Sequence, residues 1–205
     1  MNSSPRESLE SALLNPQFED LSDLPNVRPD LRYGTKQNLL HKDVYGGFQR
    51  VILHREAAAK FREASRILAE RYPGYVFAVY DALRPQAAQI EFWNLVRNTP
   101  QEHYFADPQK GSIHSFGFAI DLGLLDPQGK ELDMGTHFDD LTDLSEPQLE
   151  ADFLASGELT KGQHANRLIL RTVMAEAGFL QLPHEWWHYD ALPPAVVRSC
   201  YSRLE

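Results

Sequence analysis

Apolar positions in this chain follow a helical spacing in some segments and a strand-like spacing in others, which predicts a fold of mixed helices and strands. In residues 55–71, apolar side chains recur three and four apart between charged ones, so this segment should be a helix that ends before Pro73 and Gly74. Further helices are expected over about residues 85–97 and 164–177. Residues 75–80, rich in Val, Phe and Tyr, predict a buried strand that ends at Asp81.

The segment from residue 116 to residue 121 alternates with period two, which is typical of a strand. Its apolar rings would face one side, and Gly117, Ala119 and Asp121 would face the other. His114 lies an odd number of residues before Asp121, so an unbroken strand would place the two side chains on opposite faces. Gly117 is therefore the candidate for a bend or bulge that brings His114 round to Asp121.

Two imidazoles and two carboxylates in and beyond this segment predict a catalytic zinc site. Such a site takes three protein ligands from His, Asp or Glu and leaves one position open for water. We expect His114, Asp121 and His188 to bind one zinc ion per chain, and Glu185 to accept a proton from the water. His184 is the alternative to His188, which we favour because it completes a Glu-x-x-His pattern with Glu185. The sequence contains no His-Glu-x-x-His segment, which excludes the helical zinc-peptidase arrangement.

Composition limits the organisation and the partners of the chain. With 205 residues, of which 42% are hydrophobic, it can build one globular domain, which we place at residues 21–205 after a polar N-terminal arm at residues 1–20. The net charge of −9 argues against nucleic acid or an anionic membrane as a partner. No stretch is long enough to span a membrane and no long apolar signal region is visible, so a cytoplasmic location is expected. The oligomeric state is left open.

The candidate ligands lie in a longer pattern that resembles one known family. Ser112, Gly117 and Ala119 accompany His114 and Asp121, and the Glu-x-x-His pair follows, as in the metal-binding pattern of the D-alanyl-D-alanine dipeptidases. These are zinc peptidases related to the D-alanyl-D-alanine carboxypeptidases and to the Hedgehog domain. Three more segments are similar to that family, namely Tyr80-Asp81-Ala82-Leu83-Arg84-Pro85, Met134-Gly135-Thr136-His137-Phe138-Asp139, and Arg32-Tyr33-Gly34-Thr35 with Asn38.

The resemblance implies a fold, a reaction and a set of site residues. We expect a single α+β domain in which an antiparallel sheet carries the zinc site and helices pack mainly on one face. The implied reaction is the zinc-dependent hydrolysis of the small dipeptide D-alanyl-D-alanine, with Glu185 as general base and Arg84 as the group that stabilises the oxyanion. The implied substrate-binding residues are Ser112, Asp139, Asp81 and Tyr33, and Asp81 would also orient Arg84.

Two alternative functions stay open. One is a D,D- or L,D-carboxypeptidase or endopeptidase that acts on peptidoglycan peptides; the missing export signal and the acidic segment around Asp139 argue against it. The other is a non-catalytic zinc-containing binding module, which the presence of both Glu185 and Arg84 argues against.

Overall fold

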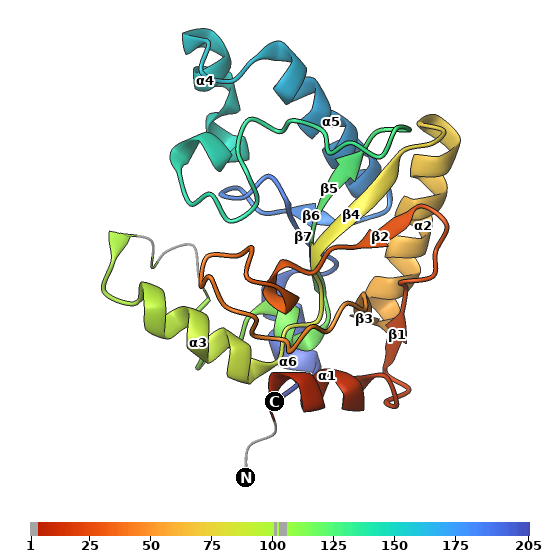
Figure 1. The fold of residues 1–205 in the computed structure, drawn as a ribbon, viewed down its shortest axis with the longest axis vertical. Coiled ribbons are helices and arrows are strands. Elements are labelled where there is room, and N and C mark those ends of the chain that lie inside the picture. The colour runs from red at the N-terminus through yellow and green to blue at the C-terminus, as the bar shows by residue number, and fades with distance from the viewer. Residues whose placement is uncertain (1–3, 101, 103–105) are drawn as a thin grey trace.

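A five-stranded sheet forms the centre of the domain (Figure 1). The computed structural model describes residues 4–100, 102 and 106–205. In sheet order the strands are β2 (Val27–Pro29), β4 (Val76–Asp81), β5 (Ala119–Leu125), β7 (His188–Asp190) and β6 (Leu180–Gln181). The single α+β domain is confirmed, but the sheet is mixed, because β2 pairs in parallel with β4 while the other pairs are antiparallel. A parallel pair needs a crossover connection, and the chain between β2 and β4 includes a long helix.

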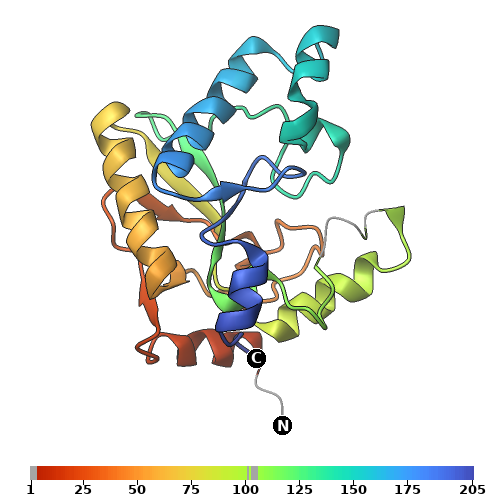
Figure 2. The ribbon, with the colours of Figure 1, turned by 180° about the vertical axis from the view of Figure 1, so that it is seen from behind.

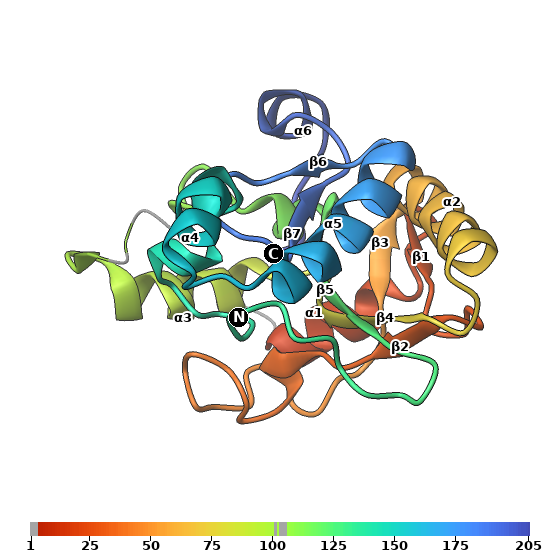
Figure 3. The same ribbon diagram turned by 90° about the horizontal axis from the view of Figure 1, so that it is seen from above.

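The two longest described helices, α2 (Arg55–Arg71) and α5 (Lys161–Glu176), pack against each other beside the sheet (Figures 2 and 3). An ion pair between Arg71 and Glu176 joins their C-terminal ends. The predicted helix over residues 55–71 is confirmed. The two other predicted helices are α3 (Gln86–Val96) and α5, shifted at their ends by a few residues. The remaining helices are α1 (Pro5–Ala12), α3 (Gln86–Val96), α4 (Glu150–Ser156) and α6 (Pro194–Cys200).

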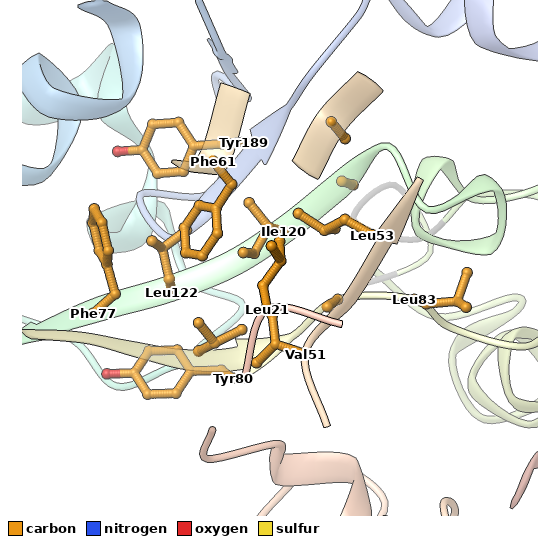
Figure 4. Packing of buried hydrophobic residues seen from close by; sticks show 14 of the residues in the cluster. Leu21, Val51, Leu53, Phe61, Phe77, Tyr80, Leu83, Ile120, Leu122 and Tyr189 are labelled. Carbon is orange, nitrogen blue, oxygen red and sulfur yellow. The ribbon is translucent and has the colours of Figure 1, made fainter. Parts of the chain in front are cut away.

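The two faces of the central strands have different environments. Phe77, Ile120 and Leu122 point to the side on which Phe61 of α2 packs, with the rings of Phe61 and Phe77 5.3 Å apart (Figure 4). Tyr80 points to the other side of the sheet, at a register shift between Val79 and Asp81. Such a bulge places consecutive side chains on the same face, so it turns both Tyr80 and Asp81 toward the polar side of the sheet.

The described part of the expected N-terminal arm packs on the domain. Helix α1 buries Leu9 and Ala12 in the core, and β1 (Phe18–Asp20) pairs with β3 (Ile52–His54) in a two-stranded antiparallel sheet. The proposed domain boundary at residue 20 stays a prediction, as does the location in the cell. No helix among residues 4–100, 102 and 106–205 is both long and apolar enough to cross a lipid bilayer.

Candidate metal centre

Three elements deliver the expected metal ligands to one point on the polar face of the sheet. Asp121 on β5 lies directly opposite His188 on β7 in the antiparallel register, so their side chains share a face. His114 comes from a 3-10 helix, Ile113–Phe116, which precedes the strand. Gly117 ends this helix with φ of 73°, and a Cβ atom there would meet the backbone nitrogen of His54. The structure therefore has the expected bend at Gly117, with a helical turn before it in place of strand.

The donor atoms of these residues converge closely enough to bind one ion. His188 Nδ1 lies 2.9 Å and His114 Nε2 lies 3.3 Å from Asp121 Oδ1, and the two nitrogens are 3.2 Å apart. All three residues are buried, and their ligand atoms lie within 4.8 Å of one another. His184, the alternative ligand, is not part of this group and lies 3.3 Å from Glu146 instead.

Each of the two histidines has one inner ring nitrogen that faces Asp121 and one outer ring nitrogen that has a partner elsewhere in the protein. His114 Nδ1 lies 2.8 Å from the carbonyl oxygen of Ala82, and His188 Nε2 lies 3.0 Å from Asp190 Oδ1. Since both partners are acceptors, each outer nitrogen can donate to its partner, which leaves the inner nitrogens, His114 Nε2 and His188 Nδ1, beside the Asp121 carboxylate. Two imidazole nitrogens and a carboxylate oxygen in this arrangement could hold a metal ion between two oriented histidines.

The charges around the site reinforce this preference for a cation. Burial opposes the charged form of His188, but the carboxylates of Asp190 and Asp121 outweigh it and raise the pKa of His188 well above its ordinary value. Burial also opposes ionisation of Asp121, but His114 and His188 hold the pKa of Asp121 far below its usual range. Asp190 was not singled out in the sequence, although its position two residues after His188 on a strand was a usable signal.

Glu185 lies beside the three converging residues without belonging to them. Its Oε2 atom is 3.8 Å from His188 Nδ1, and the residue is 9% exposed. Burial raises the pKa of Glu185 to about 8 against the opposing effect of His188, and the carboxylates of Asp121 and Asp139 raise it further. A carboxyl group with a pKa near neutrality can both accept and release a proton, which is what a general base that also protonates a leaving group must do.

Arg84 is held by several hydrogen bonds next to the candidate metal ligands. Its Nε and Nη2 atoms both lie 2.8 Å from Asp81 Oδ2, and Nη1 donates to Gln89 Oε1 at 2.9 Å. Tyr45 donates its hydroxyl to the other oxygen of Asp81 at 2.9 Å. Nη2 of Arg84 also lies 3.7 Å from Asp121 Oδ2. Asp81 is fully buried and does not line the cavity beside the candidate ligands, so it orients the guanidinium of Arg84 and does not contact a substrate. Gln89 and Tyr45 also hold this arrangement in place, and the sequence analysis did not predict either of them.

A cavity of about 240 Å³ opens onto this centre. Its wall includes the candidate metal ligands, Glu185 and Arg84. It also includes Ser112, Tyr33 and Asp139 from the expected substrate-binding set. Both carboxylate oxygens of Asp139 lie 2.9 Å from the Tyr33 hydroxyl, which donates to them. Burial raises the pKa of Asp139 to about 7, although the hydrogen bond from Tyr33 acts in the opposite direction. The volume is below the range of about 300–1,000 Å³ common for drug-sized ligands, so the cavity suits a small molecule.

Comparison with known proteins places this chain in a family. The family model described as D-ala-D-ala dipeptidase matches residues 17–203. A D-alanyl-D-alanine dipeptidase of Escherichia coli K12 is 34% identical over 172 residues, which cover 84% of this chain and 82% of the relative. Proteins of the same description from Enterococcus faecium and Synechocystis are 31% and 29% identical, over 80% and 71% of this chain and 85% and 71% of their own lengths.

Proposed function

The chain belongs to the D-ala-D-ala dipeptidase family and is thus a peptidase, and from this membership we propose that it hydrolyses the dipeptide D-alanyl-D-alanine with the help of one zinc ion. The observation that carries the proposal is the convergence of His114, Asp121 and His188 beside Glu185 in a small cavity that also presents Asp139. The relatives are named for this activity, and the donor set suits zinc.

The proposed roles at the reacting bond follow from the position of each group. When bound, zinc would lower the pKa of a water molecule and polarise the scissile carbonyl. Glu185, raised in pKa by burial, takes the proton from the attacking water and delivers it to the departing amine nitrogen. Arg84, fixed by Asp81 and Gln89, presents a positive charge where the oxyanion develops, which acts mainly in the transition state.

The proposed substrate contacts use both charged ends of the dipeptide. The half-buried carboxylate of Asp139, which accepts the hydroxyl of Tyr33, lies on the cavity wall, and this supports a role in binding the free ammonium group. Ser112 lines the same cavity just before the 3-10 helix that carries His114, so its hydroxyl can donate to the carboxylate end. Burying both charges without such partners would be too costly for binding.

The test compares three substrates and measures the bound metal. We expect about one zinc per chain. We also expect kcat/KM for D-alanyl-D-alanine to exceed that for its N-acetyl form by about a hundredfold or more, since the blocked amine leaves Asp139 unpaired. A pentapeptide ending in the same two residues should be equally poor. Comparable rates on all three substrates would instead support a carboxypeptidase, and zinc binding with no turnover of any of them would support a binding module.

A further inference from the structure

A second guanidinium group, that of Arg198 on α6, lines the same cavity as the metal ligands. Its Nε and Nη2 atoms donate to the carbonyl oxygen of Gly111 at 3.2 and 3.1 Å. Gly111 immediately precedes Ser112, so these hydrogen bonds hold Arg198 next to the segment that leads to His114. They occupy two of the five N–H donors of the guanidinium and leave the others available.

The position of Arg198 follows from how α6 leaves the sheet. The chain passes from His188 on β7 to α6, and the amide of Ala191 donates to the carbonyl oxygen of Phe118 at 2.7 Å, which ties this connection to the segment before β5. Pro194 and Arg198 both line the cavity and are four residues apart, so one face of α6 forms part of its wall. Arg198 is thus placed by the strand that carries a metal ligand.

The charges of the cavity wall leave Arg198 without an anionic partner. Among residues 4–100, 102 and 106–205, no carboxylate lies within ion-pair distance of its guanidinium. The other arginine of the wall, Arg84, is already engaged by Asp81 and Gln89. The acids of the wall are unsuited to receive an anionic group of the substrate; they are Asp121, Asp139, Glu185 and Asp190.

We propose that Arg198 binds the α-carboxylate of the dipeptide and thereby selects substrates with a free C-terminus. This inference rests on the proposed function, because it names the residue that recognises the second charged end of the same substrate. A guanidinium can hold a carboxylate through two parallel hydrogen bonds, which are stronger than those from a neutral hydroxyl such as that of Ser112. The sequence motifs did not point to Arg198, which lies ten residues after His188 in a segment without a motif.

The experiment removes the positive charge of Arg198 from the protein and, separately, the negative charge of the C-terminal carboxylate from the dipeptide. Arg198→Gln should raise KM for D-alanyl-D-alanine about 10- to 100-fold while kcat stays within about threefold, since a hydrogen bond between two charged groups is lost. Wild type should hydrolyse the C-terminal amide of the dipeptide about 10- to 100-fold less efficiently than the free acid. On this amide, Arg198→Gln should change kcat/KM less than about threefold, because the carboxylate that Arg198 would bind is absent. Arg198→Lys should restore most of the preference for the free acid, because it keeps the positive charge.

Arg203→Gln is the matched control. Arg203 donates to the carbonyl oxygen of Pro108 at 3.0 Å, close to the same segment, but does not line the cavity, so its loss should leave both substrates unaffected. Equal losses on the acid and the amide in Arg198→Gln would show that Arg198 only holds Gly111 in place and would overturn the inference. Unchanged kinetics in that variant would overturn it as well. Wild-type enzyme inactive on D-alanyl-D-alanine would instead refute the proposed function itself.

Discussion

Replacing Asp139 by asparagine should stabilise the protein and disable it at the same time. Asp139 is placed in the cavity wall with φ of 63°, a left-handed conformation that asparagine tolerates as well as aspartate does. The asparagine side chain can still accept the hydroxyl of Tyr33. What the substitution removes is the ionisation of a half-buried carboxyl group, so its effect on stability can be assigned to charge.

The magnitude follows from the pKa of Asp139. Burial raises this pKa from an ordinary value of 3.8 to about 7, so between these pH values the unfolded chain is ionised while the folded chain remains protonated. The folded state therefore loses stability as the pH rises through this window, and the full loss is present above pH 7. The shift corresponds to at most about 4 kcal/mol, and because Asp139 faces a cavity that water can enter, we expect about 2 kcal/mol.

The assay is urea unfolding of metal-free Asp139→Asn and wild-type protein, followed by tryptophan fluorescence at pH 8 and at pH 4. The variant should be more stable by about 2 kcal/mol at pH 8 and nearly equal to wild type at pH 4. Its kcat/KM for D-alanyl-D-alanine should fall about a hundredfold, because no anion remains for the ammonium group. A variant less stable than wild type at pH 8, or equally stabilised at both pH values, would refute this reasoning.

Three further predictions concern the metal centre. His188→Ala should lose zinc and activity, whereas His184→Ala should keep zinc, as measured by metal analysis; the reverse outcome would exchange their roles. Glu185→Ala should fold and keep zinc but lose activity about 10²- to 10⁴-fold, and loss of zinc would make Glu185 a ligand instead of the base. Asp190→Ala should weaken zinc binding about 10- to 100-fold in a chelator competition, whereas unchanged affinity would show that Asp190 does not orient His188.

Those parts of the fold with a strong local signal could be predicted from the sequence. The spacing of apolar residues identified α2 with its observed bounds, and Val, Phe and Tyr identified β4. Helix α1 was not predicted because it is mostly polar and buries only one side, through Leu9 and Ala12. Strand β2 has three residues, includes Pro29, and pairs in parallel with β4 across a long crossover, which no local pattern indicates.

In the candidate site, too, some residues could be predicted from the sequence and others could not. Its candidate metal ligands and Glu185 were identifiable because they fall in two short motifs, and the structure brings the three candidate ligands together. Gln89, Tyr45 and Arg198 contribute through contacts that depend on tertiary placement: Gln89 reaches Arg84 across a helix start, and Tyr45 reaches Asp81 from 36 residues away in the chain. Single residues without a motif become visible only when the fold sets them beside the site.

The register of β4 against β5 explains why Arg84 and the candidate metal ligands are so close. The bulge after Val79 makes Asp81 the direct neighbour of Asp121 across the strand pair. Asp81 orients Arg84, so the guanidinium comes to lie 3.7 Å from the Asp121 carboxylate. If the pairing continued in regular register after Val79, Tyr80 would lie opposite Asp121, and the side chain of Asp81 would point to the apolar face of the sheet. The spacing between Arg84 and the candidate metal ligands is thus set by one irregularity in backbone pairing.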